Sequence, residues 1–140
     1  EKHLVDMNKI QSDFHHIATQ FDVMVAEGSG GIICPLRMDS SPIMLTDVIQ
    51  TLHLPILIVA HAGLGTINST VLTAAYAKQH NIIVNGIILN QYDSDNLMHR
   101  DNKKQIERLT GIPVVACVKP NETELSVSAE SLLHLCNDIS

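Results

Sequence analysis

Four short apolar runs divide this chain and limit the folds open to it. They cover residues 22–26, 54–60, 82–89 and 114–118. Within each run, apolar residues follow one another instead of alternating with polar ones. Continuous apolar runs are typical of strands in parallel sheets, because helices cover both faces of such a sheet. The runs therefore predict buried strands of a parallel sheet.

Segments with apolar residues at helical spacing lie between and around these runs. In one segment, for example, Ile67, Val71 and Ala75 share a predicted helical face. The helical segments cover residues 4–20, 45–52, 67–80, 98–110 and 127–136. This order predicts an α/β fold, with a parallel β-sheet and helices on both faces. With 140 residues, 45% of them hydrophobic, residues 1–140 are expected to form a single α/β domain.

Composition argues against several classes of partner. The longest apolar runs, 54–60 and 82–89, fall far short of the ~20 residues that a membrane-crossing helix needs, so no membrane partner is expected. The formal net charge is −6 and the longest basic cluster is Lys103-Lys104, so no nucleic acid partner is expected. Three widely spaced cysteines without a CxxC motif indicate neither a disulfide framework nor a zinc site. A reducing, cytoplasmic location is therefore expected.

A glycine-rich turn joins the second apolar run to a helical segment. Gly63 and Gly65 let the backbone turn without Cβ clashes, and the polar residues that follow lie where the first amides of a helix lack internal partners. Such a helix start is a ready site for a carboxylate or a phosphate. The same pattern also occurs as a plain connection, and both interpretations stay open at this point. His61 lies near the turn and is assigned no role.

Other polar residues also come directly after predicted strands. Glu27 and its glycines follow the first run, Asn90 follows the third, and residues 119–121 follow the fourth. Ligands bind open parallel sheets at the carboxyl ends of the strands. We therefore expect the functional residues at that edge of the sheet.

Four motifs together resemble the dethiobiotin synthetase family in their order and spacing. They are Glu27-Gly28-Ser29-Gly30-Gly31, Leu54-Pro55, the turn at residues 64–70 (LGTINST) and residues 86–90 (GIILN). The similarity runs from about residue 21 to residue 121. The combination is specific, although each motif alone is weak. The resemblance implies the fold of P-loop NTPases.

The resemblance also implies an activity. In biotin synthesis this family closes a cyclic urea on 7,8-diaminononanoate with carbon dioxide, using ATP and Mg²⁺. The substrate amines supply the nucleophile, and phosphoryl transfer depends mainly on positioning and charge neutralisation, so no catalytic side chain is assigned. In the family the substrate carboxylate belongs to a molecule bound mainly by the other subunit. A homodimer with substrate sites at the interface is therefore implied.

Carried onto this sequence, the resemblance assigns two groups of site residues. The substrate group is Gly65, Thr66, Ile67, Asn68 and Asn102. The nucleotide group is Glu27, Gly28, Ser29, Gly30, Asn90, Lys119, Pro120 and Asn121. Glu27 is also the implied metal ligand, since a carboxylate oxygen suits Mg²⁺. Asn90 is the implied adenine reader, since its amide offers both a donor and an acceptor.

The family's phosphate loop is the main departure. No Gly-Lys pair occurs in the 140 residues, so the pattern GxxxxGK[ST] is absent from them. A parallel sheet that begins with a helix also lacks its first strand. We therefore expect an upstream segment with the first strand and the phosphate loop, and expect residues 1–140 to be inactive without it.

Two alternatives stay open. The first is a noncatalytic or regulatory subunit that has kept the fold without the phosphate loop. An intact mass near 15.3 kDa, with a genuine start at Glu1 and no partner chain, favours that alternative. The second is a related P-loop amide ligase, such as a cobyrinic acid amide synthetase. Assays with diaminononanoate and with corrinoid acids separate the second alternative from a dethiobiotin synthetase.

Overall fold

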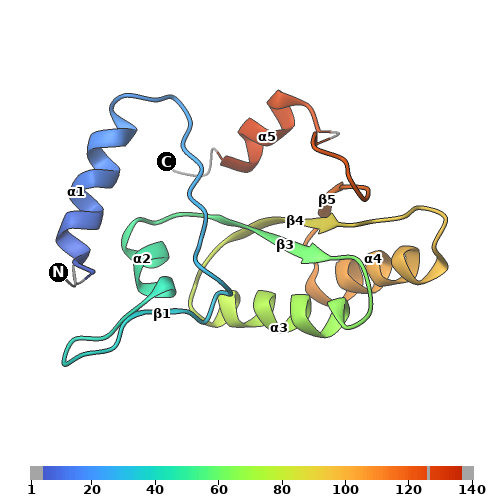
Figure 1. The fold of residues 1–140 in the computed structure, drawn as a ribbon, viewed down its shortest axis with the longest axis horizontal. Coiled ribbons are helices and arrows are strands. Elements are labelled where there is room, and N and C mark those ends of the chain that lie inside the picture. Colours follow the sequence, from blue (N-terminus) through green and yellow to red (C-terminus); the bar gives the residue numbers. More distant parts are fainter. Residues whose placement is uncertain (1–4, 126, 137–140) are drawn as a thin grey trace. The chain divides into compact units, whose positions relative to one another are not determined.

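The computed structural model describes residues 5–125 and 127–136. The chain divides into two compact units, Glu1–Leu54 and Pro55–Ser140, and each is described by itself (Figure 1). The glycine-rich turn at residues 64–70 and the parallel strands belong to the second unit.

The first unit contains two helices that the sequence predicts. Helix α1 spans Met7–Ala18, and the Asp6 side chain accepts a hydrogen bond from the backbone N–H of Asn8 at 2.9 Å, which satisfies a free amide at the helix start. Helix α2 spans Leu45–Thr51. Both helices lie within the predicted segments 4–20 and 45–52, so these two predictions are confirmed.

Between these helices the chain departs from the prediction. Residues 22–26, predicted as a strand, form irregular chain, and Val25 is 85% exposed. The described strands of this unit are instead β1, Pro35–Arg37, and β2, Ile43–Met44, which pair antiparallel. Within the described residues no strand pairs with 22–26. An apolar run without a neighbouring strand has no partners for its backbone groups, so the strand prediction there is wrong.

Three parallel strands form the sheet of the second unit. Their order is β3, β4, β5, so β4 is central, and the outer edge of β3 is unpaired within the described part of the chain. The strands span Ile56–His61, Val84–Asn90 and Val114–Cys117. The register aligns His61 with Asn90, so β3 and β4 end together at their carboxyl ends. The prediction of a parallel sheet is confirmed for these three strands.

Helices lie on both sides of this sheet (Figure 1). Helices α3 and α4 span Thr66–Gln79 and Leu97–Thr110 and lie on one side, while α5, Ala129–Cys136, lies on the other. The core on the α3 and α4 side consists of Ile58, Ala62, Ala74, Ile87, Leu89 and Ile106. The layers agree with the predicted α/β fold. No helix in the described ranges has the length and apolarity to cross a membrane.

The buried face of α3 differs from the predicted one. Its buried residues are small or polar: Thr66, Thr70, Ala74 and Ala77. Ile67 and Val71 are only partly buried, and Ala75 is exposed. Small side chains on the core side let the helix lie close to the sheet, whereas the larger apolar side chains face α4 and solvent. The helix prediction is confirmed and Ile67 packs against the core, but the exposure of Ala75 contradicts the predicted face at that position.

Glu107 links α4 to β5. Its Oε1 accepts hydrogen bonds from Lys103 Nζ at 3.0 Å and from the backbone N–H of Val114 at 3.1 Å. Burial raises the pKa of this carboxyl, but the two hydrogen bonds and the charge of Lys103 together outweigh burial. The pKa of Glu107 therefore lies below its ordinary value.

We expect Glu107 to make the stability of the second unit depend on pH. Because its pKa is lower in the folded state, the stabilisation is complete above the ordinary glutamate value of about 4.3 and is lost as the pH falls through the folded value. At neutral pH, Glu107→Gln should lower the free energy of unfolding by up to about 1 kcal/mol, the scale of a partly exposed pair. The difference from the native chain should shrink in acid.

Urea unfolding followed by tyrosine fluorescence measures this effect, because both tyrosines, Tyr76 and Tyr92, lie in the second unit. The control is Glu124→Gln, which changes an exposed carboxyl in the loop before α5. A pH-independent difference for Glu107→Gln, or an equal effect of the control, contradicts the assignment.

Candidate functional site

The candidate substrate site is built on the turn between β3 and α3. Strand β3 ends at His61, and α3 begins at Thr66. Gly65 caps the helix with a φ of 88°, a left-handed conformation that a residue with a Cβ adopts only at a cost of about 1–2 kcal/mol. This glycine lets the strand turn into the helix within four residues of the sheet edge.

Three hydrogen bonds hold the turn against the rest of the second unit. The backbone N–H of Ala62 donates to the carbonyl of Asn90 at 2.8 Å, which extends the pairing of β3 with β4 by one residue. Asn102 Nδ2, from α4, donates to the carbonyls of Ala62 at 2.9 Å and Gly63 at 3.2 Å. The turn is therefore fixed both to the sheet and to the neighbouring helix.

The first turn of α3 presents backbone donors. The N–H of Thr66 donates to the carbonyl of Gly63 at 3.3 Å, and the N–H of Ser69 donates to that of Gly65 at 3.2 Å. No acceptor within residues 5–125 and 127–136 bonds the N–H groups of Ile67 and Asn68, and Gly65 supplies no side-chain cap. Unbonded amides at a helix start attract an anion, since they add to the positive end of the helix dipole.

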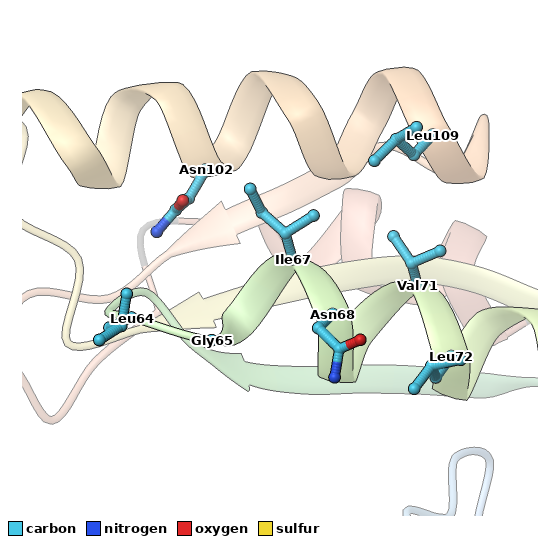
Figure 2. Close-up of a pocket in the computed structure, with 8 residues that line it drawn as sticks. All are labelled: Leu64, Gly65, Ile67, Asn68, Val71, Leu72, Asn102 and Leu109. Carbon is cyan, nitrogen blue, oxygen red and sulfur yellow. The ribbon is translucent and has the colours of Figure 1, made fainter.

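A groove between α3 and α4, here the α3–α4 groove, lies beside these amides (Figure 2). Its lining residues are Leu64, Gly65, Ile67, Asn68, Val71, Leu72, Asn102 and Leu109. Leu64, Leu72 and Leu109 are 94%, 61% and 59% exposed. The groove thus combines amides that no described acceptor bonds with exposed apolar side chains, and these two features suit a ligand that carries a negative group on an aliphatic chain.

Asn102 is buried, with 7% exposure, and lies at the edge of this groove. Figure 2 shows its amide nitrogen directed toward the turn that carries Leu64 and Gly65. Its two N–H donors match the two carbonyls that it bonds, those of Ala62 and Gly63. In this arrangement Asn102 supports the shape of the turn, and a direct bond from its Nδ2 to a carboxylate requires one of those donors to be released.

The implied adenine residues lie at the carboxyl edge of the same sheet. Asn90 ends β4, and its side-chain Oδ1 accepts a hydrogen bond from the backbone N–H of Gln91 at 2.9 Å. Lys119 follows β5 after one residue, and its backbone N–H donates to Glu122 Oε2 at 2.8 Å. The two loops are joined where the N–H of Tyr92 donates to the carbonyl of Val118 at 2.8 Å. Pro120 and Asn121 continue the second loop and are exposed.

The remaining nucleotide residues, Glu27, Gly28, Ser29 and Gly30, lie in the first unit. All four are exposed, in irregular chain before β1. In the described residues, no group of three or more His, Cys, Asp or Glu is arranged to hold a metal ion. A single exposed carboxylate fits the mode in which Mg²⁺ takes one or two carboxylates, substrate phosphates and several waters. Glu27 is therefore suited to be one such ligand.

Two features of the turn have no signal in the sequence. His61 Nδ1 accepts a hydrogen bond from the backbone N–H of Gly63 at 3.0 Å. Thr66 and Thr70 are 4% and 1% exposed, and their hydroxyl oxygens lie 3.4 Å apart. Both contacts are local, since His61 and Gly63 are two residues apart and the two threonines lie one turn apart on α3. The sequence pattern does not specify the side-chain conformations that form them.

Known proteins are similar to this chain over most of its length. Residues 1–127 match the AAA domain family. The chain is 48% identical over 118 residues to ATP-dependent dethiobiotin synthetase BioD of Clostridium botulinum strain Eklund 17B. It is 44% identical over 135 residues to the protein of that name from strain 657, and 49% identical over 114 residues to that of Brachyspira hyodysenteriae strain ATCC 49526.

These alignments cover 84%, 96% and 81% of this chain, but 52%, 59% and 52% of the relatives. The chain therefore spans little more than half the length of the curated relatives that it matches. The resemblance to dethiobiotin synthetases that the sequence motifs predict is confirmed.

We expect Asn102→Leu to loosen the turn, because the carbonyl of Ala62 loses its side-chain donor and that of Gly63 keeps only the N–H of Thr66, at a cost of about 1–3 kcal/mol. Amide hydrogen exchange should accelerate at Gly63 and Thr66, whose N–H groups are hydrogen-bonded in the turn, and remain slow in the core of β4. The control is Asn68→Leu, at an exposed position on α3, which should leave the exchange of Gly63 unchanged. Native exchange rates in Asn102→Leu refute the supporting role.

Proposed function

This chain belongs to the AAA domain family, and from that premise we propose that it is part of an ATP-dependent dethiobiotin synthetase. In the proposed reaction, ATP and carbon dioxide convert 7,8-diaminononanoate into a cyclic urea. The identities of 44% to 49% with proteins of that name support the proposal. Because the chain spans little more than half of those proteins, it accounts for part of the active site.

One observation carries the substrate assignment. The amides of Ile67 and Asn68 have no acceptor in the described part of the chain, and both residues line the apolar α3–α4 groove. Diaminononanoate has a carboxylate at one end of an aliphatic chain, so it matches both properties. We assign the carboxylate to the segment from Gly65 to Asn68, with Asn102 at the edge of the groove.

A homodimer completes this substrate site in the proposal. Exposed leucines line the groove, and large exposed apolar side chains in a contiguous patch are typical of an interface. A second copy that covers Leu64, Leu72 and Leu109 would exclude water from the aliphatic part of the substrate. The reacting amines of that substrate would then lie mainly on the other subunit.

The nucleotide residues are assigned by the same resemblance. We place adenine beside Asn90 and the loop formed by Lys119, Pro120 and Asn121. Glu27 is the proposed Mg²⁺ ligand, and the segment from Gly28 to Gly30 is proposed to approach the phosphates through its backbone amides. When bound, Mg²⁺ neutralises charge on the phosphates.

Without a GxxxxGK[ST] pattern, residues 1–140 are proposed to be inactive on their own. The proposed location of the protein is the cytoplasm.

The substitution Asn68→Asp tests the carboxylate assignment, because it should raise the stability of the chain and lower its affinity for the substrate. A carboxylate in the first turn of α3 should stabilise the helix by about 0.3–1 kcal/mol through its dipole. The same charge should repel the substrate carboxylate and weaken diaminononanoate binding by roughly tenfold or more, about 1.4 kcal/mol. Calorimetric titration of the chain with diaminononanoate gives the affinity, and urea unfolding gives the stability.

The matching ligand control is the corresponding diamine without the carboxylate, whose weaker binding should not respond to Asn68→Asp. Asn68→Gln is the neutral protein control. If Asn68→Asp binds diaminononanoate as tightly as the native chain does, the carboxylate does not occupy this helix start. A native chain that prefers corrinoid acids to diaminononanoate identifies the related amide ligase instead.

Glu27→Ala tests the metal assignment. In a chimera that joins this chain to the part of the Clostridium botulinum strain Eklund 17B relative that it does not cover, we expect Mg²⁺-dependent turnover to fall by more than about tenfold. Diaminononanoate binding should not change. Asp22→Ala, at an exposed acidic position in the same stretch, is the control. Undiminished turnover in Glu27→Ala removes this residue from the metal site.

A further inference from the structure

His61 makes a contact that the proposed reaction does not use. It is the last residue of β3, and its ring Nδ1 accepts a hydrogen bond from the backbone N–H of Gly63, two residues later, at 3.0 Å. A Cβ on Gly63 would lie 3.0 Å from that Nδ1 and 3.1 Å from Cε1 of the same ring. The imidazole therefore packs directly on the turn, and glycine at position 63 makes room for it.

Gly63 is held from its other end as well. Its carbonyl accepts hydrogen bonds from Asn102 Nδ2 at 3.2 Å and from the backbone N–H of Thr66 at 3.3 Å. His61 thus fixes the N–H of this residue, while Asn102 and the first residue of α3 bond its carbonyl. Glycine has the greatest backbone freedom of any residue, so Gly63 needs such contacts to keep a single conformation.

The start of α3 depends on that conformation. Rotation of the Gly63 backbone would change the direction of its carbonyl and break its bond to Thr66, the first helical residue. The next two residues, Ile67 and Asn68, carry the amides that no described acceptor bonds. A change at Gly63 would therefore move these amides relative to the α3–α4 groove.

From this geometry we infer that His61 is a positioning residue for the carboxylate site, acting through the N–H of Gly63. This inference rests on the proposed function. The ring holds the turn as an acceptor, through Nδ1. His61 is not assigned a bond to the substrate.

The test compares His61→Asn with His61→Leu. The Oδ1 of an asparagine accepts a hydrogen bond from the N–H two residues later, in the same way as Nδ1 does here, whereas leucine has no acceptor. We expect His61→Leu to weaken diaminononanoate binding by roughly threefold to tenfold, the effect of one net hydrogen bond, and His61→Asn to restore it to near the native value. The diamine without the carboxylate should bind all three chains equally.

A second readout needs no ligand. Backbone amide NMR of the 140-residue chain should show shifted resonances for Gly63, Ile67 and Asn68 in His61→Leu and near-native ones in His61→Asn. Native resonances in His61→Leu overturn the inference, as does a His61→Asn variant that behaves like His61→Leu in both measurements. If the native chain does not bind diaminononanoate, the substrate proposal fails, while the NMR comparison still decides whether His61 holds the turn.

Discussion

The buried amide of Asn102 is the interaction on which the turn between β3 and α3 depends. It reaches from α4 to two consecutive carbonyls, those of Ala62 and Gly63, at the point where β3 leaves the sheet. A carbonyl directed into the protein needs a hydrogen-bond donor, and the side-chain amide of Asn102 supplies one N–H to each of the two carbonyls. The contact thus sets the direction in which α3 begins, and it determines which surface the first amides of that helix face.

Much of the second unit could be predicted from the order of apolar runs and helical segments. The strands β3, β4 and β5 and the helices between them follow from periodicity, because each is long enough to show its own pattern. Residues 22–26 show the limit of this reasoning, since a short apolar run becomes a strand only beside another strand. The predicted buried face of α3 differs from the observed one for a similar reason. Its small residues Thr66 and Thr70 are buried because the helix lies close to the sheet, and hydrophobicity does not reveal that distance.

The candidate site likewise has a part that the sequence predicts and a part that only the structure shows. The glycines of the turn signal a helix start because they are required locally, so the segment from Gly65 to Asn68 could be located without a structure. The bonds from Asn102 to Ala62 and Gly63 join residues that are close only in the folded protein. The contacts of His61 with Gly63 and of Glu107 with Lys103 are local, but they depend on side-chain conformations that the sequence pattern does not specify. The assignments of Glu27, Asn90 and Lys119 rest on family resemblance, and they stay predictions.

The outer edge of β3 has a practical consequence for anyone who handles this polypeptide. Within the described residues, the backbone N–H and C=O groups on this side of β3 have no neighbouring strand. Such an edge is a template for strands of other molecules. Self-association at this edge would rise with protein concentration. Dilute samples are therefore needed to distinguish a defined dimer from larger assemblies that form by pairing of strand edges.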